Sequence, residues 1–127
     1  MKRADFLKTL GLGASGLILP KMGIVQEPIK VYENYIRGIT YYKFNKLSTM
    51  LKSGSEVELT REYDNLYDVF AIAIHYNNQK LGYLPAYENV VLANLIDKGV
   101  RLHAFIGKID KHQLSVEIFA ELVVNST

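Results

Sequence analysis

The chain has 127 residues, of which 49% are hydrophobic, and it lacks cysteine. This fits one globular domain with a short appendage, and it excludes disulfides, zinc–cysteine sites and thiol catalysis. The first 28 residues hold four of the 15 basic and two of the 13 acidic residues, so the remaining domain is neutral. A neutral domain excludes a broad positively charged surface for duplex DNA and leaves at most a local basic patch.

Residues 1–28 are predicted to be a leader and linker that do not belong to the domain. A basic start is followed by an uncharged run over residues 9–19, which Pro20 ends. The run is shorter than the ~20 apolar residues of a membrane-spanning helix, and it has the shape of a secretory signal. Residues 3–8 are similar to a twin-arginine export signal, except that Ala4 stands where the second arginine belongs.

Two interpretations of this leader stay open. In the first, it contacts a membrane or the export machinery and places the protein outside the cytoplasm or at a membrane. In the second, it is an apolar or amphipathic helix that packs on the domain or on a protein partner, and the protein is cytoplasmic. The sequence favours the first interpretation, with residues 29–127 as the globular domain.

Two elements are predicted at the start of this domain. Residues 31–42 contain several aromatic side chains and predict a strand, in which Gly38 marks a bend or a bulge. Residues 45–52 predict a short helix, because apolar side chains recur there at helical spacing and Gly54 follows near the place of a C-terminal cap.

A hairpin is predicted in the middle of the chain. Residues 56–62 alternate between apolar and polar side chains, as a half-buried strand does. Residues 70–76 are apolar on both faces, which is typical of a central strand. Asn77 and Asn78 then predict a tight turn, because asparagine tolerates positive φ, and residues 80–84 complete the hairpin.

The last third of the chain predicts a helix and two strands. Asn89 is a candidate N-cap for a helix over residues 90–98, and Gly99 suits its C-terminal cap. Residues 100–106 and residues 114–122 alternate as strands on either side of a turn. Six short strands with two inserted helices indicate an all-β fold, as a small closed or nearly closed barrel rather than a sandwich.

The corner at residues 64–68 is the strongest functional signal. Asn65, Tyr67 and Asp68 lie between two predicted strands, where a turn would need only Asn, Asp or Gly. An aromatic ring and a carboxylate on one loop of a rigid sheet indicate a recognition site. In the alternative, which stays open, Asp68 caps backbone N–H groups and Tyr67 is a core or rim aromatic.

Patterns of catalysis and of metal binding do not occur in the sequence. The three histidines have no metal-ligand spacing, and there is no nucleophile elbow, no paired-acid motif and no phosphate-binding glycine loop. We therefore predict that the protein is not an enzyme and has no catalytic residue, metal or cofactor. Arg61 and Glu62 are interpreted either as part of a binding site or as a surface ion pair.

Five short motifs taken together resemble one known family. They are GITYY at 38–42, LTRE at 59–62, DNLYD at 64–68, AIAI at 71–74 and GYLP at 82–85. In this order and spacing they are similar to the HIRAN domain in its stand-alone bacterial form, over about residues 35–123. The resemblance implies a modified OB fold, here an OB-like six-stranded antiparallel β-barrel with two helices.

The resemblance also implies a binding site for the 3′ end of single-stranded DNA. Tyr41 and Tyr42 match an aromatic pair that lines the pocket, although one of them must face the core because adjacent strand residues face opposite sides. Tyr67 matches the tyrosine that packs against the terminal nucleotide. Asp68 matches the carboxylate that accepts a hydrogen bond from the 3′-hydroxyl, and Asn65 shapes this corner.

This sequence departs from the family pattern at three positions. Thr40 stands in place of an arginine, Tyr83 in place of a histidine, and Leu66 in place of a proline. The implied nucleic-acid-binding residues are Thr40, Tyr41, Tyr42, Arg61, Asn65, Tyr67, Asp68 and Tyr83. Local positive charge would come from Lys43, Lys46, Arg61 and Lys80.

The sequence therefore supports two functional hypotheses. The first is a non-catalytic module that binds single-stranded DNA 3′ ends, and the family resemblance supports it. The second is an exported interaction or small-ligand-binding domain that keeps the fold without the DNA role. The leader, the neutral domain and Thr40 favour the second hypothesis.

Overall fold

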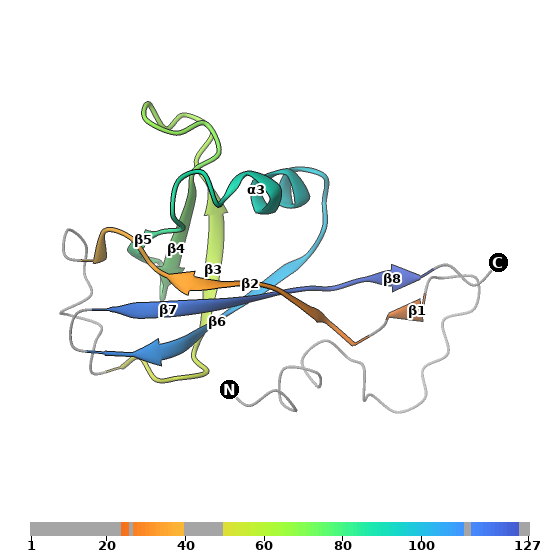
Figure 1. The fold of residues 1–127 in the computed structure, drawn as a ribbon, viewed down its shortest axis with the longest axis horizontal. Helices are drawn as coiled ribbons and strands as arrows, with labels where there is room; N and C mark the ends of the chain where they lie inside the picture. Colours follow the sequence, from red (N-terminus) through yellow and green to blue (C-terminus); the bar gives the residue numbers. More distant parts are fainter. Residues whose placement is uncertain (1–23, 26, 40–49, 111–112, 125–127) are drawn as a thin grey trace.

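The computed structural model describes residues 24–25, 27–39, 50–110 and 113–124. In this part of the chain, strands dominate and one helix is present (Figure 1). In chain order the elements are β1 (Ile24–Val25), β2 (Ile29–Tyr35), β3 (Glu56–Arg61), β4 (Ile72–Tyr76), β5 (Gln79–Tyr83), α3 (Val90–Asp97), β6 (Leu102–Ile109), β7 (Leu114–Ala120) and β8 (Val123–Val124).

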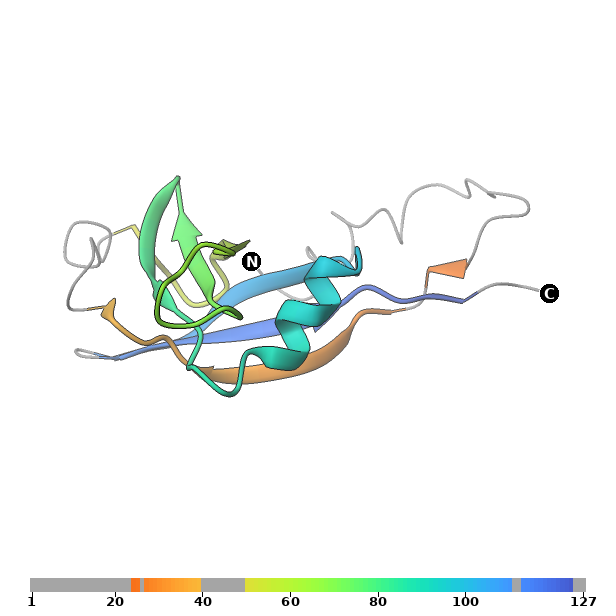
Figure 2. The same ribbon diagram turned by 90° about the horizontal axis from the view of Figure 1, so that it is seen from above.

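Six of these strands form one antiparallel sheet in the order β2-β7-β6-β3-β4-β5. Strands β6 and β7 pair along most of their length, and β3 pairs with β6 at its start and with β4 at its end. Strand β3 therefore connects two halves of the sheet. In Figure 2, β2, β6 and β7 run alongside one another, while β4 and β5 turn away from them.

A short backbone bridge joins the two ends of this strand order. Just beyond β2, Arg37 pairs with Tyr83 at the end of β5, and the N–H of each residue donates to the carbonyl oxygen of the other at 2.8 and 2.9 Å. The N–H of the neighbouring Ile36 donates to the carbonyl oxygen of Leu114 in β7 at 2.7 Å. The chain leaving β2 thus contacts both β7 and β5, and the sheet closes into a barrel.

The interior of the barrel is filled by branched aliphatic side chains. The largest fully buried ones come from β4, β5, β6 and β7, and they include Ile72, Ile74, Leu81, Ile106 and Ile118. Full burial of such a side chain stabilises the fold by about 1.5–3 kcal/mol. Helix α3 adds its own buried residues, Leu92 and Ala93, to the core cluster.

The predicted OB-like six-stranded antiparallel β-barrel is confirmed, and so are several of its local details. Asn77 and Asn78 both have positive φ, at 49° and 63°, as the predicted hairpin turn requires. The helix predicted over residues 90–98 is present as α3, and Gly99 follows it with a φ of 90°. Asn89 is the N-cap residue by position, but its side chain makes no capping hydrogen bond.

Two predictions near the start of the domain need correction. Strand β2 begins at Ile29 rather than at residue 31, and it ends at Tyr35, before the chain turns at Gly38, where φ is 80°. The continuation predicted over residues 40–42 lies outside the described residues. Of the helix predicted over residues 45–52, residues 45–49 also lie outside them, and residues 50–52 are not helical.

Strand boundaries later in the chain also differ from the prediction. Strand β4 begins at Ile72, because the N–H of Ala71 donates to the carbonyl oxygen of Asp68 and keeps residues 70–71 in the corner. Strand β6 is displaced to Leu102–Ile109. Strand β7 ends at Ala120, after which the N–H of Glu121 donates to the carbonyl oxygen of Arg101.

A second, two-stranded sheet lies apart from the barrel. It pairs β1 with β8, so that Ile24 is opposite Val124 and Val25 is opposite Val123 (Figure 1). Residues 24–25, which the sequence assigns to the linker, therefore contact the C-terminal strand. Residues 1–23 lie outside the described residues, and the domain boundary at residue 28 stays a prediction. Within the described part of the chain, no helix has the length and apolar character needed to cross a bilayer.

Candidate functional site

The corner between β3 and β4 is folded around the side chain of Asn65. The Oδ1 atom of Asn65 accepts hydrogen bonds from the backbone N–H groups of Tyr67 and Asp68, at 2.9 and 3.0 Å. Its Nδ2 atom donates to Oε1 of Glu62 at 3.1 Å. Asparagine is suited to such turns because its side chain can hydrogen-bond the backbone two residues further on. The corner is thus held from within and tied to the end of β3.

Asp68 connects this corner to the start of α3. Its Oδ1 accepts a hydrogen bond from the N–H of Phe70 at 2.9 Å, and its Oδ2 accepts one from Nδ2 of Asn89 at 2.8 Å. Asp68 therefore caps the corner, as one interpretation of the sequence held. Because each carboxylate oxygen has two acceptor positions, Asp68 keeps the capacity to accept a further hydrogen bond.

Two large side chains at the tip of the corner point into solvent. Leu66 is 93% exposed and Tyr67 is 97% exposed. This exposure excludes a place in the core for Tyr67. The hydrogen-bonded loop holds the backbone of Tyr67 and leaves its flat ring exposed, which suits stacking on a ligand more than packing in the core.

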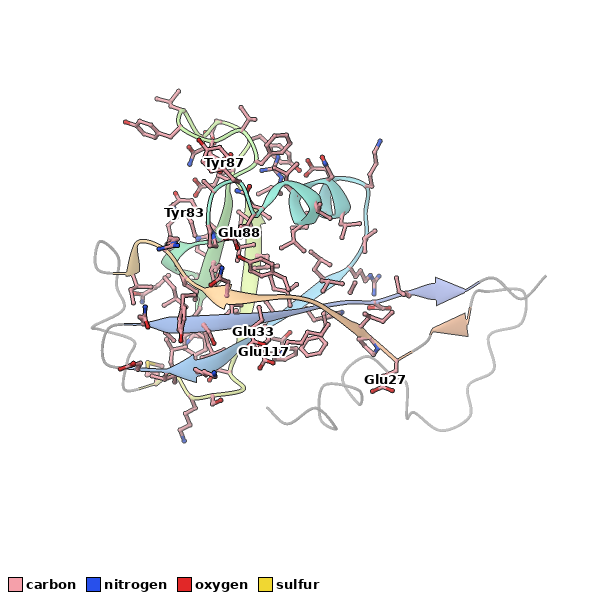
Figure 3. All side chains as sticks on the ribbon, viewed as in Figure 1. Glu27, Glu33, Tyr83, Tyr87, Glu88 and Glu117 are labelled. Carbon is pink, nitrogen blue, oxygen red and sulfur yellow. The ribbon has the colours of Figure 1, made fainter. Side chains whose placement is uncertain are left out.

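The corner forms one wall of a cleft of about 520 Å³. This volume lies within the range of ligand-binding pockets. Asn65, Tyr67 and Asp68 come from the corner, and Arg37 and Tyr83 come from the two segments whose bridge closes the barrel. The structure thus brings together four of the predicted site residues and adds Arg37. In Figure 3, Tyr83 lies beneath the protruding corner loop, at the β5 side of the molecule.

A network of hydrogen bonds fixes Tyr83 at the cleft. The Tyr83 hydroxyl donates to Oε1 of Glu62 at 2.7 Å, and Nζ of Lys80 donates to Oε2 of Glu62 at 2.6 Å and to the Tyr83 hydroxyl at 2.8 Å. Burial disfavours the charged Glu62, but hydrogen bonds from Lys80, Tyr83 and Asn65 outweigh it and lower the pKa of Glu62. Burial likewise disfavours the Lys80 cation, but its hydrogen bonds raise the pKa of Lys80 above the ordinary value. Both groups are therefore ionised at neutral pH.

Arg61 lies behind the corner rather than in the cleft, and its side chain is only 5% exposed. Its Nε donates to Oδ1 of Asp97 at 3.0 Å, and its two Nη atoms donate to the carbonyl oxygens of Ala71 and Val69 at 2.7 and 3.0 Å. Arg61 pairs with Asp97 rather than with its neighbour Glu62. The guanidinium supports the base of the corner, and its predicted contact with nucleic acid stays a prediction.

Three further predicted site residues, Thr40, Tyr41 and Tyr42, lie outside the described residues. Their predicted position opposite Tyr67 stays a prediction. Among the residues that the structure does describe, no three histidine or acidic side chains gather as a metal site would need.

Sequence reasoning missed two residues near the cleft. Arg37 lines it, but no local pattern marks this residue, because its place depends on the bridge to Tyr83. Tyr87 follows Ala86, which lines the cleft, in the turn between β5 and α3. It is 96% exposed and has a φ of 72°, which is unusual for a residue other than glycine.

Comparisons with known proteins identify the family to which this fold belongs. The sequence model of the HIRAN domain family matches residues 29–125, which is most of the chain. The chain belongs to the HIRAN domain family. No curated protein matches the chain.

Two crystal structures resemble this HIRAN domain. A protein from Lactobacillus plantarum is 30% identical with a TM-score of 0.68, over 74% of this chain and 95% of that one. The HIRAN domain of human HLTF is 16% identical with a TM-score of 0.66, over 81% of this chain and 82% of that one. The second likeness is one of fold alone.

The backbone at Tyr87 leads to a prediction about the stability of this HIRAN domain. A left-handed conformation costs an L-residue roughly 1–2 kcal/mol, and glycine is free of that cost. Because the ring of Tyr87 is exposed, its loss removes little packing. We expect Tyr87→Gly to raise the free energy of unfolding by about 1 kcal/mol in urea titration, since glycine loses part of the gain to unfolded-state entropy.

The matched control for this change is Asn78→Gly in the hairpin turn. Asn78 also has a positive φ, at 63°, but asparagine tolerates that conformation. Asn78→Gly should therefore change the urea midpoint less than Tyr87→Gly does. A lower stability of Tyr87→Gly would mean that the tyrosine ring contributes to the fold through contacts.

Proposed function

We propose that this HIRAN domain is a non-catalytic nucleic-acid-binding module and that its cleft receives the 3′ end of single-stranded DNA. The main support for this proposal is that the exposed Tyr67 ring and the Asp68 carboxylate line the same cleft. Membership of the HIRAN family supports the general role, and the two side chains support the specific ligand.

Tyr67 would supply most of the affinity in this proposal. Stacking of a base on an aromatic ring contributes roughly 1–3 kcal/mol per base and requires no particular base. The cleft would therefore bind strands of many sequences. The hydrogen bonds that Asn65 accepts from the corner's backbone hold the ring's loop in place, so little order has to be gained on binding.

Asp68 would supply the preference for a free 3′ end. A carboxylate accepts a hydrogen bond from a hydroxyl, whereas it repels a phosphate. A strand that continues beyond the cleft, or one that ends in a 3′-phosphate, would place negative charge near this carboxylate. A terminal hydroxyl would instead donate to it.

The experiment that tests this proposal compares two short single strands that differ only at the end. The strand with a 3′-hydroxyl should bind about tenfold more tightly than the same strand with a 3′-phosphate, since a hydrogen bond to a charged group contributes about 1.5–3 kcal/mol. Fluorescence anisotropy at fixed salt measures both affinities. In Asp68→Asn the difference should shrink, because the repelling charge is gone.

The Asp68→Asn variant is chosen because it can keep the corner folded. The new amide oxygen can still accept from the N–H of Phe70, and its amide nitrogen can donate to Asn89 after the Asn89 amide turns over. An unchanged thermal midpoint would verify this. Equal binding of the two strands by the unaltered domain would reject the 3′-end role.

A second candidate function is an interaction or small-ligand-binding domain in an exported protein. The signal-like residues 1–28 and the neutral charge of the rest of the chain favour it. A cleft of about 520 Å³ with apolar walls also suits a small organic ligand. Failure of both strands to bind at millimolar concentration would favour this function over the first.

A further inference from the structure

We infer that Arg37 is the phosphate-binding residue of the cleft and that, together with Asp68 on the opposing corner, it sets the direction in which a strand enters. This inference rests on the proposed function and adds to it a phosphate-binding residue and the direction in which the strand lies in the cleft. The hydroxyl of the terminal nucleotide would lie at Asp68, and the phosphate on the other side of that nucleotide would lie at Arg37.

Among the described residues that line the cleft, Arg37 is the only cation and Asp68 is the only anion. The two come from different segments, since Asp68 belongs to the corner after β3 and Arg37 follows β2. A nucleotide has its own asymmetry, because a 3′-terminal unit carries a neutral hydroxyl on one side and a charged phosphate on the other. The charges of the cleft match this asymmetry in one orientation only.

Among the residues that the structure describes, two other cations near the cleft are already bound within the protein. Lys80 is held by Glu62 and Tyr83, and Arg61 is held by Asp97 and two carbonyl oxygens. Withdrawing Lys80 toward a ligand would leave the partly buried Glu62 carboxylate without its cation, which is costly. Withdrawing Arg61, whose side chain is only 5% exposed, would break its hydrogen bonds to two backbone carbonyl oxygens. A phosphate in the cleft would therefore be bound by a residue outside these two networks.

Arg37 is such a residue. Its side chain is exposed and forms no ion pair with any residue that the structure describes. Hydrogen bonds lower the pKa of the nearby Glu88, and the charge of Arg37 lowers it further. The Oε1 atom of Glu88 accepts from the Tyr32 hydroxyl at 2.7 Å and from Nδ2 of Asn34 at 2.8 Å. Glu88 therefore attracts the guanidinium without forming an ion pair in contact with it, and the guanidinium can turn to a ligand.

The backbone of Arg37 is held in place, whereas its side chain forms no ion pair with any described residue. Its N–H and its carbonyl oxygen are both hydrogen-bonded to Tyr83, which itself lines the cleft. An arginine that starts from a fixed backbone position can present its planar fork to a phosphate with two parallel N–H donors. Substitution of the side chain leaves these backbone hydrogen bonds unchanged, so the binding role can be tested without loss of the barrel.

The test uses the full chain and a short single strand in which one phosphate at a time is replaced by a neutral methylphosphonate. With the natural side chain, replacing the last internucleotide phosphate should weaken binding about tenfold, because a charge-assisted hydrogen bond is lost. Arg37→Gln should weaken binding of the natural strand by a similar factor. When the last internucleotide phosphate is already a methylphosphonate, Arg37→Gln should cause no further loss of affinity.

Two controls accompany this cycle. Arg101→Gln removes an exposed arginine from the segment between α3 and β6, away from the cleft, and should leave both affinities unchanged within about twofold. A methylphosphonate placed several linkages from the 3′ end should change the affinity of Arg37→Gln and of the unaltered protein by the same factor. As a second readout, the slope of log affinity against log salt should fall by about 0.7 in Arg37→Gln.

The possible failures can be told apart. If Arg37→Gln binds the natural strand as tightly as the unaltered protein does, Arg37 does not bind this phosphate. The same conclusion follows if Arg37→Gln weakens binding of the methylphosphonate strand by the same factor as it weakens binding of the natural strand. In that case a 3′-hydroxyl preference that depends on Asp68 would leave the proposed function standing. If the unaltered protein binds no single strand, the proposed function and this inference both fail.

Discussion

Gly82→Ala is expected to lower the free energy of unfolding by about 3 kcal/mol, at the upper end of what overpacking costs. Gly82 lies in β5 beside the bridge that closes the barrel. A Cβ atom there would lie 2.2 Å from the carbonyl oxygen of Arg37 and 2.7 Å from Cγ2 of Ile36. The first of these atoms is backbone, so the added methyl group can be accommodated only if the closing segment moves away from β5.

Urea or thermal denaturation measures this loss, and Gly99→Ala is its control. Gly99 has a φ of 90°, but an added Cβ would meet nothing within 4 Å. Gly99→Ala should therefore cost only the roughly 1–2 kcal/mol of a left-handed backbone. If both variants lose the same stability, the close approach at Gly82 is not what limits the closure of the barrel.

Tyr67→Ala is expected to lower the affinity for single-stranded DNA by roughly 10- to 100-fold, which corresponds to the loss of one stacked base. The fold should keep its stability, because the Tyr67 side chain is almost fully exposed and contributes little to the core. Fluorescence anisotropy gives the affinity and a thermal melt gives the stability. Tyr67→Phe, which keeps the ring, should bind nearly as well as the natural side chain.

Tyr63 provides a second comparison from the same region. It is also exposed, but its hydroxyl donates to Asp97, and its ring stacks under the guanidinium of Arg61 behind the corner. Tyr63→Ala should leave DNA affinity within about threefold of the starting value. Equal losses for Tyr63→Ala and Tyr67→Ala would indicate that aromatic surface in general, rather than the cleft, binds the strand.

Local patterns in the sequence predicted most of the barrel. The alternation over residues 56–62 predicted β3, the two asparagines predicted the hairpin turn, and Gly99 marked the end of α3. Each of these signals depends on residues a few positions apart, and so it can be read without knowledge of the fold. The polar corner was predicted in the same way, because Asn65 folds it through bonds to its own neighbours.

Contacts between distant segments were not predictable in this way. The sequence suggested that Arg61 would bind nucleic acid or pair with Glu62. Its partner is instead Asp97, which lies 36 residues later at the end of α3. It gave no indication of Arg37, whose place in the cleft depends on a bridge to Tyr83. Such pairs are determined by how the strands assemble. The residues that flank each member in the sequence therefore do not predict its partner.

The bridge between Arg37 and Tyr83 couples occupancy of the cleft to the integrity of the whole fold. The same two residues close the barrel through their backbones and line the cleft with their side chains. A ligand that contacts both side chains therefore binds the closed barrel and not the opened one. By mass action such a ligand stabilises the folded state by about 2.7 kcal/mol at a hundred times its Kd. Thermal melting would thus report on a ligand of this domain before its chemical identity is known.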